Sequence, residues 1–217
     1  MKFIILGCGS SMGVPRADGF FGKCDFKNPK NYRSRSSALI KSKNINVLIN
    51  NAGNAHGMDL FQNGNIDDWD KMIDINVKGL MYVTKAIVNS MIKNSTGHII
   101  NIGSLAGKEV YPKGNIYCAS KYAVKAISES LRLDLNKHNI KVSEINPGLV
   151  ETSFSDVRFK GDTQTAKNVY KGYEALQAED IAEIISFVIS RPKHVNIADL
   201  LVLPSEQACS TLINKKL

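Results

Sequence analysis

The sequence has few cysteines, no long apolar run and no paired metal ligands, and each of these absences excludes a class of protein. Its 217 residues include four cysteines and four histidines. The cysteines form no Cys-x-x-Cys pair, and no two histidines have the spacing that places both on one metal ion. No uninterrupted apolar run approaches the roughly 18 residues that a membrane helix needs. We therefore expect no disulfide framework, no metal site and no membrane span.

The amino terminus shows no export signal either. The apolar stretch at residues 1–6 is too short for a signal peptide, and no cleavage-site pattern follows it. With 43% hydrophobic and 22% charged residues, the chain can bury a core, and its length suits one α/β domain or two small ones. We expect a cytoplasmic protein.

The net charge of +8 lies almost entirely in the first fifth of the chain. Residues 1–43 carry nine Lys or Arg and only two Asp, whereas the remaining 174 residues carry 19 basic and 18 acidic side chains. The stretch 13–37 is also rich in turn-forming residues and interleaves aromatic with basic side chains, a composition that can bind nucleic acid. No RNA- or DNA-binding motif accompanies it, so solvated loops are the favoured interpretation and no nucleic-acid partner is expected.

Strand and helix patterns alternate along the chain, most regularly after residue 44. The predicted strands are 2–6, 37–41, 45–49, 98–102, 141–145 and about 198–203. The predicted helices run from a cap at Asp67 or Asp68 to about residue 94, from about 117 to 137, and from about 178 to 191. Such alternation is typical of a parallel sheet covered by helices.

One pair of side chains suggests chemistry. Tyr117 and Lys121 are four residues apart on a predicted helix and therefore share one face. Ser104 follows the carboxyl end of a predicted strand, where open α/β sheets bind ligands, and Asn76 lies within the first long helix. A tyrosine is a poor base at neutral pH, and a neighbouring ammonium favours its phenolate. By themselves, however, two such residues are common surface features.

Five segments that occur in a fixed order along the chain make the pattern around Tyr117 and Lys121 specific. The segments are Asn50-Asn51-Ala52-Gly53, Asp74-Ile75-Asn76-Val77, Gly103-Ser104, Tyr117-Cys118-Ala119-Ser120-Lys121 and Asn146-Pro147-Gly148-Leu149-Val150-Glu151-Thr152. In this order and spacing, residues from about 44 to 217 resemble the short-chain dehydrogenases/reductases. Residues 157–162, with 194–197, are similar to the subgroup that oxidises serine and short 3-hydroxy acids with NADP.

The resemblance implies a hydride-transfer oxidoreductase that uses NADP, with NAD possible, acts on a small hydroxy acid and forms a homo-oligomer. It implies that Tyr117 is the acid/base, that Lys121 also holds the nicotinamide ribose, that Ser104 orients the substrate oxygen and that Asn76 supports a proton relay. The implied cofactor-binding residues are Asn50, Ala52, Gly53, Tyr117, Lys121, Pro147, Gly148, Val150 and Thr152. Arg158 is a candidate clamp for a substrate carboxylate, because a guanidinium matches a carboxylate with two parallel hydrogen bonds; a solvated arginine on a loop is the alternative.

The front of the chain departs from this pattern. Only 49 residues precede Asn50, too few for the glycine-rich turn and the strand–helix steps that open a full family member. Residues 1–43 instead resemble the start of metallo-β-lactamase-fold hydrolases, through Leu6-Gly7-Cys8-Gly9-Ser10-Ser11, Gly13-Val14-Pro15-Arg16, Cys24-Asp25, Asn28-Pro29-Lys30-Asn31 and Arg33-Ser34-Arg35-Ser36-Ser37. That family's metal-binding histidine segment is absent, so hydrolase activity is not supported.

The predicted fold is therefore a truncated Rossmann-like, doubly wound parallel α/β sheet that lacks the usual N-terminal dinucleotide-binding half and carries a short basic extension. We divide the chain into 1–43, a hydrolase-like fragment, and 44–217, the dehydrogenase part. Strand 2–6 could lie parallel to strand 45–49 and replace the missing first strand, an arrangement that antiparallel pairing of 37–41 with 45–49 would exclude. The alternative functions are a catalytically silent remnant that retains only subunit association and, less favoured, a metal-dependent phosphodiester hydrolase.

Overall fold

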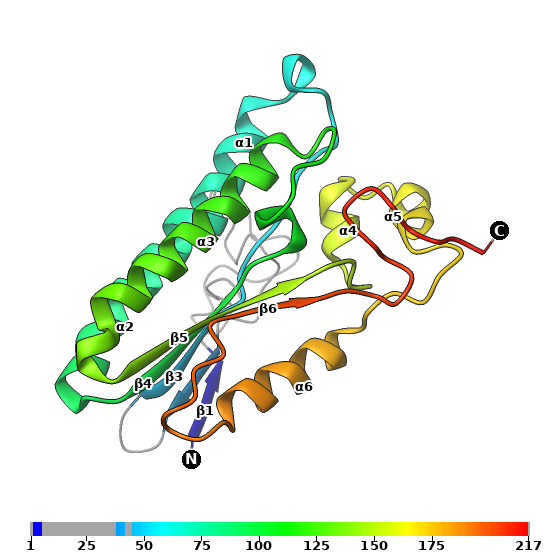
Figure 1. The fold of residues 1–217 in the computed structure, drawn as a ribbon. Coiled ribbons are helices and arrows are strands. Elements are labelled where there is room, and N and C mark those ends of the chain that lie inside the picture. The colour runs from blue at the N-terminus through cyan, green and yellow to red at the C-terminus, as the bar shows by residue number, and fades with distance from the viewer. Residues whose placement is uncertain (1, 6–37, 42–44, 217) are drawn as a thin grey trace, which may run out of the picture.

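The computed structural model describes residues 2–5, 38–41 and 45–216, and these form an open six-stranded sheet flanked by helices (Figure 1). The strands are β1 (Lys2–Ile5), β2 (Ala38–Lys41), β3 (Ile45–Asn50), β4 (Gly97–Ile102), β5 (Ile140–Pro147) and β6 (Asp199–Val202). They lie side by side in the order of the sequence, and β3 to β6 pair in parallel. The expected parallel α/β sheet is confirmed for this part of the chain.

The first two strands do not replace a missing parallel strand. β2 pairs antiparallel with β3, with Ala38 opposite Ile49, and β1 pairs antiparallel with the outer edge of β2. The idea that strand 2–6 lies parallel to strand 45–49 is therefore wrong. β2 occupies the edge of β3 because the three residues between these two strands suffice for a hairpin but not for a parallel crossover, which needs a dozen or more. With that edge taken, β1 pairs with β2 instead. The turn-rich stretch 13–37 and most of the hydrolase-like segment lie outside the described residues.

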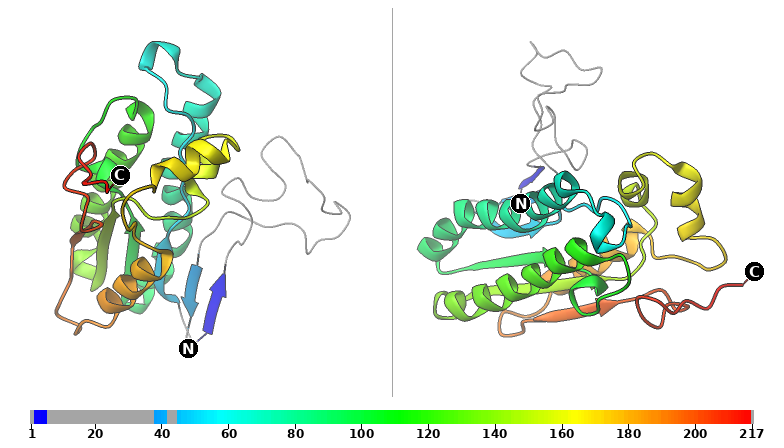
Figure 2. Two further views of the ribbon diagram at one scale, coloured as in Figure 1. Left: turned by 90° about the vertical axis from the view of Figure 1, so that its right-hand side faces the viewer. Right: turned by 90° about the horizontal axis from the view of Figure 1, so that it is seen from above.

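Helices cover the sheet on both faces, as the doubly wound prediction required. One face carries α2 (Leu80–Asn94) and α3 (Asn115–Leu135), and the other carries α6 (Ala178–Ile189) (Figure 1). α1 (Ile66–Ile73) and a π-helical stretch, η3 (Asp74–Gly79), continue directly into α2. α4 (Phe154–Arg158) and α5 (Thr163–Val169) form a separate lobe that projects from the end of the sheet (Figure 2). In the described part of the chain, the short 3-10 turns are η2 (Phe61–Asn63), η4 (Leu105–Gly107) and η5 (Asn136–His138).

Alternate side chains of the parallel strands form two separate cores. Leu48, Ile99 and Val142 pack against α2 and α3, whereas Ile100 and Ile145 pack against Val188 of α6. Because both faces of these strands are covered, each strand contributes apolar side chains to both cores. This rigid double layer holds the carboxyl ends of β3, β4 and β5 in one row.

The element boundaries differ from the prediction in small ways. The first helix is capped by Asn65, whose side-chain oxygen accepts the backbone N–H of Asp68 at 3.2 Å, so the predicted cap at Asp67 or Asp68 is wrong. Asn65 wins because a cap must precede the residue whose N–H it accepts by two or three positions. β5 also runs on to include Pro147, and the sequence patterns predicted neither α4 nor α5.

Candidate active site

Tyr117 and Lys121 lie on α3 and are almost fully buried, with 8% and 6% of their surfaces exposed. The Lys121 ammonium donates a hydrogen bond to the carbonyl oxygen of Ile102, the last residue of β4, at 3.0 Å. Burial lowers the pKa of Lys121 to about 8, partly opposed by the negative charge of Glu144. Burial also raises the pKa of Tyr117 above its usual value, while a hydrogen bond with Ser104 and the charge of Arg158 oppose that rise.

Asn76 ties the π-helical stretch to the loop after β3. Its side-chain oxygen accepts the backbone N–H of Asn54, and its amide donates to the carbonyl of Asn54, both at 2.8 Å. The same amide donates to Ser120 Oγ at 3.0 Å, one residue before Lys121. A Cβ on Gly53 would lie 3.4 Å from both Asn76 Oδ1 and Lys121 Nζ, so these two polar atoms approach one point of the loop. The structure thus brings Asn76 and Lys121 together.

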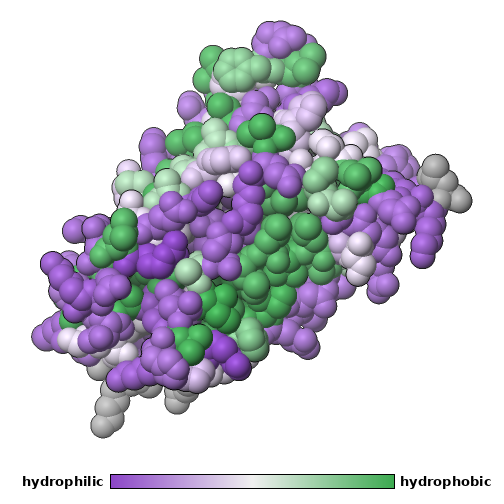
Figure 3. All heavy atoms as spheres, viewed as in Figure 1, coloured by the Kyte–Doolittle hydropathy of each residue, from purple (hydrophilic) through white to green (hydrophobic). Residues whose placement is uncertain are grey.

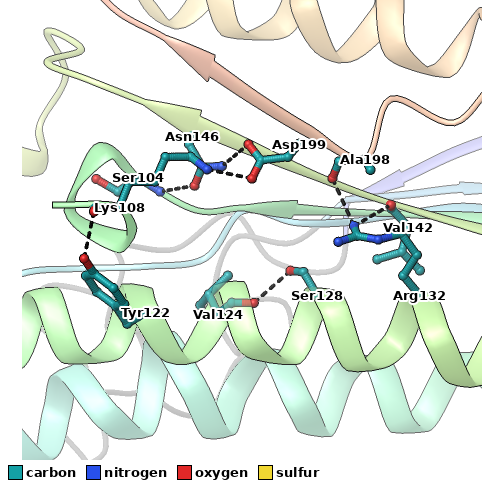
Figure 4. A network of polar contacts seen from close by, with 10 residues as sticks. All are labelled: Ser104, Lys108, Tyr122, Val124, Ser128, Arg132, Val142, Asn146, Ala198 and Asp199. Carbon is teal, nitrogen blue, oxygen red and sulfur yellow. Dashed lines mark hydrogen bonds and ion pairs between the residues drawn. The ribbon is translucent and has the colours of Figure 1, made fainter.

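Ser104 stands at the turn between β4 and η4, and its backbone is held from the next strand. Asn146 Oδ1 accepts the backbone N–H of Ser104 at 3.0 Å, and Asn146 in turn donates to Asp199 at 3.2 Å (Figure 4). Lys108 forms an ion pair of 2.6 Å with the same aspartate. The prediction counted Asn146 only as part of a motif, yet its carboxamide sets the position of the serine.

Glu144 is a buried carboxyl group beneath this turn. Burial raises its pKa, and its Oε1 has no hydrogen-bond partner among the described residues. A Cβ on Gly103 would lie 2.6 Å from that oxygen and would collide with the carboxamide oxygen of Asn146. Only glycine therefore fits between β4 and Ser104.

Asn50 directs its side chain inward. Its amide donates to Thr84 Oγ1 at 2.9 Å and to Asn101 Oδ1 at 2.8 Å, and Asn101 donates onward to Ser128 of α3 at 2.9 Å. This buried chain of hydrogen bonds connects β3 and β4 with the two helices that cover them. Ala52 and Gly53, which follow, lie in the loop at the carboxyl edge of the sheet.

The loop after β5 is held from the C-terminal tail. Gly148 N–H donates to the Val202 carbonyl at 2.7 Å, which continues the pairing with β6 past Pro147. Leu149 N–H donates to the side-chain oxygen of buried Gln207 at 2.9 Å. Sequence reasoning missed Gln207, because nothing local to the tail reveals which loop it contacts.

The far end of the same loop faces the α4–α5 lobe. The carbonyl of Val150 accepts the Tyr170 hydroxyl at 2.9 Å, and Thr152 Oγ1 accepts the Phe154 N–H at 3.3 Å. Thr152 itself is exposed. The expected cofactor-binding residues after β5 therefore lie at the same edge of the sheet as Ser104, with their backbone fixed at several points.

Arg158, at the end of α4, lies close to Tyr117. Its Cζ atom is 5.5 Å from the centre of the Tyr117 ring and 5.7 Å from that of Tyr111. Its Nη1 donates to the Tyr111 hydroxyl at 3.1 Å. The structure thus places this guanidinium against the expected acid/base, which a freely solvated loop arginine would not show.

No group of three or more His, Cys, Asp or Glu side chains in residues 45–216, or in the two described strands before them, is arranged to hold a metal ion. In the described part of the chain, no helix combines the length and the apolar character that crossing a membrane requires.

An open parallel sheet with a buried tyrosine–lysine pair beside the carboxyl end of a strand defines a Rossmann-like α/β protein whose candidate active site lies at that edge. The sequence matches the family model described as short chain dehydrogenase over residues 16–162. The chain therefore belongs to the short-chain dehydrogenase family.

Curated relatives share nearly half of the aligned residues. The NADP-dependent 3-hydroxy acid dehydrogenase of Schizosaccharomyces pombe is 46% identical over 172 residues, which is 79% of this chain and 66% of that protein. The Escherichia coli K12 protein of the same description, YdfG, is 45% identical over 170 residues, or 78% of this chain and 68% of that protein. The chain thus spans about two thirds of the length of the curated relatives it matches.

A solved structure gives the same answer for the fold. A structure described as the closed form of serine dehydrogenase complexed with NADP+ superposes with a TM-score of 0.77 at 42% identity, covering 82% of this chain and 73% of that one. The comparisons lend no support to a hydrolase-like segment at 1–43 or to a chimeric chain, since the dehydrogenase model already begins at residue 16. Short turn-rich motifs of Gly, Ser and Arg are too permissive to identify a family by themselves.

Proposed function

We propose that this protein is an NADP-dependent oxidoreductase that oxidises the alcohol of serine or a short 3-hydroxy acid. The observation that carries the proposal is that the Arg158 guanidinium lies over the Tyr117 ring, and that the buried ammonium of Lys121, one turn further along α3, binds the carbonyl at the carboxyl end of β4. Relatives that share this part of the sequence carry the same activity in their names.

The residues present fit the nicotinamide end of the dinucleotide. The buried Lys121 ammonium uses one hydrogen bond on Ile102, and its pKa of about 8 keeps it largely protonated at neutral pH, so it can donate to ribose hydroxyls. The backbone of the loop from Pro147 through Gly148 and Val150 to Thr152 would hold the carboxamide, and Asn50 to Gly53 would line the adenosine side. When bound, NADP accepts the hydride that the alcohol carbon gives up.

Side chains of the protein would remove the proton of the substrate hydroxyl. Ser104 would hold the substrate oxygen beside Tyr117, and the phenolate oxygen of Tyr117 would take the hydroxyl proton and become the phenol. Burial opposes the phenolate, whereas the hydrogen bond with Ser104 and the charge of Arg158 favour it. Asn76, bonded to Ser120 beside Lys121, would orient a water molecule that carries the proton toward solvent.

Arg158 would bind the carboxylate of the hydroxy acid. Nε and Nη1 are engaged with Gly57 and Tyr111, and among the described residues no hydrogen bond engages Nη2. A short hydroxy acid whose carboxylate is bound there would place its hydroxyl-bearing carbon near Tyr117. This favours short hydroxy acids over uncharged alcohols.

Self-association is proposed for the same chain, and association without catalysis is the second candidate function. Apolar side chains on the outer surfaces of α2 and α3 are exposed, namely Met81, Tyr82, Tyr122 and Leu133, and Leu201 on the edge strand β6 is 42% exposed. Figure 3 shows an apolar area over the edge strand β6. Patches of this kind are typical of surfaces that another protein copy covers. Light scattering that reports only a monomer would contradict this part of the proposal.

Turnover distinguishes the two candidates. We expect the purified protein to reduce NADP+ with L-serine or 3-hydroxypropionate, and the Tyr117→Phe variant to lose at least a hundredfold in kcat because the acid/base contributes about that much. An associated protein without turnover at saturating nucleotide would establish the silent remnant instead.

A further inference from the structure

The α4–α5 lobe is fastened to the amino end of α1 by an ion pair. Lys160 Nζ lies 2.6 Å from Asp68 Oδ2, and the aspartate side chain is 9% exposed whereas the lysine side chain is 56% exposed. A carboxylate that stays buried after its cation is removed is costly, so this pair contributes more than an ordinary surface pair. Lys71 also lies near Asp68, but at 3.7 Å.

A reciprocal pair of hydrogen bonds holds the same two segments together. Gly57 N–H donates to the carbonyl of Arg158 at 2.9 Å, and Arg158 Nε donates back to the carbonyl of Gly57 at 3.3 Å. Gly57 lies in the loop between β3 and α1, on the same side of the molecule as Asp68. Backbone and side-chain contacts thus join one lobe to one loop.

The turn after α4 directs the lysine toward α1. Lys160 and Gly161 both have left-handed backbone conformations, with φ of 54° and 89°, and Gly161 N–H donates to the carbonyl of Asp156 at 2.9 Å. This is how helices commonly end, but a lysine is disfavoured in that conformation. The ion pair with Asp68 offsets that conformational cost and explains why a lysine occupies position 160.

Arg158 lies two residues before this turn, so whatever holds Lys160 also sets the arginine. Its guanidinium occupies the space between the rings of Tyr111 and Tyr117. If the lobe moved away from α1, both the bond to Gly57 and the position over Tyr117 would be lost. The short segment 158–160 thereby connects Asp68 with the guanidinium beside Tyr117.

We propose that Asp68 and Lys160 are positioning residues whose ion pair holds the segment 154–169 against α1 and so sets Arg158 over Tyr117 for a substrate carboxylate. The inference rests on the proposed function, in which Arg158 binds that carboxylate. Neither residue touches the substrate.

Hydrogen–deuterium exchange of the whole protein tests the fastening without any need for turnover. We expect Asp68→Asn and Lys160→Met to raise the exchange rates of amides in 154–169 about five- to tenfold, the scale of one partly buried ion pair. Lys160→Arg keeps the charge and is expected to exchange as the wild type does. Asp74→Asn is the matched control, because it breaks the exposed Lys78–Asp74 pair on η3. Unchanged exchange in both Asp68→Asn and Lys160→Met would overturn the proposal.

Steady-state kinetics tests the positioning of Arg158. The two charge-removing variants are expected to raise KM for 3-hydroxypropionate about tenfold, with kcat within about threefold of the wild type and with KM for the uncharged 3-hydroxypropanamide unchanged. Equal effects on both substrates, or none, would overturn the positioning role. A wild-type protein without turnover would contradict the proposed function, and the exchange experiment would still decide whether the pair fastens the lobe.

Discussion

The Lys121 ammonium donates to the carbonyl oxygen of Ile102 at 3.0 Å while only 6% of the lysine is exposed. No carboxylate in the described structure forms an ion pair with it; Glu144 acts only through its charge. A buried ammonium with one backbone acceptor destabilises a fold, so its presence indicates that it serves a ligand instead.

Removing this ammonium is therefore expected to stabilise the protein. Lys121→Met should raise the free energy of unfolding at pH 7 by about 1–3 kcal/mol, because the pKa falls from 10.5 to about 8 on folding and each unit corresponds to about 1.4 kcal/mol. Between these two values the unfolded chain binds more protons, so wild-type stability rises with pH and the advantage of the variant shrinks above pH 8. Urea unfolding at pH 7 and pH 10 measures both effects, with Lys93→Met on the surface of α2 as control.

His98 makes the protein sensitive to acid. It lies buried on β4, where its Nε2 is 2.8 Å from Ser143 Oγ of β5, and burial lowers its pKa to about 4. Between pH 6.5 and pH 4 the unfolded chain takes up a proton that the folded chain does not, so stability is complete above 6.5 and falls as the pH drops through this window. The loss amounts to about 2–3 kcal/mol.

His98→Gln should remove this part of the acid sensitivity, even if it lowers stability at pH 7. Thermal unfolding at pH 7.0 and pH 4.5 gives the comparison, and His194→Gln, at an exposed position, is the control. Equal losses of melting temperature in His98→Gln and the wild type would contradict the assignment.

Gln207 is expected to matter for nucleotide binding although it lies in the C-terminal tail. Gln207→Ala removes the acceptor of the Leu149 N–H and should weaken NADPH binding about five- to twentyfold, because a loosened loop must be ordered again on binding. Exchange of the Leu149 amide should rise in the same variant without nucleotide. Gln164→Ala on α5, whose exposed side chain donates to Asn168, is the control; matching affinities in the two variants would exclude a role for Gln207.

Two glycine substitutions should change the stability of the protein in opposite directions. Gly103→Ala places a methyl group against Glu144 and Asn146 and should destabilise the protein by about 2–4 kcal/mol, with loss of the Ser104 position. Gly79→Ala, in a helical conformation with only the Asp74 carbonyl at 3.4 Å, should stabilise it by about 0.5–1 kcal/mol. Differential scanning calorimetry of both variants checks the pair, and a stable Gly103→Ala protein would show that the turn has room.

The sequence predicted the parallel sheet well because apolar runs such as 45–49 and 98–102 are buried on both faces and flanked by turns. It also grouped Tyr117 with Lys121 through helical spacing. It could not predict that Asn146 holds Ser104 or that Gln207 holds Leu149, since these contacts join residues 42 and 58 apart. The lobe 154–169 was missed because its helices are too short to show a period.

How the first two strands pair was left open by the sequence for a different reason. Composition gave no preference between parallel and antiparallel neighbours, and only the short connection favours the hairpin. The division near residue 43 and the roles of the individual site residues stay predictions.

Calorimetric titration of the purified protein with NADPH, with Lys121→Ala beside it, tests the central claim most directly. Micromolar binding, about −8 kcal/mol, that is at least tenfold weaker in Lys121→Ala is the predicted result. It would show that the described sheet edge holds the nucleotide through its buried lysine. Absence of binding to the wild-type protein, or equal binding to both proteins, would contradict the account.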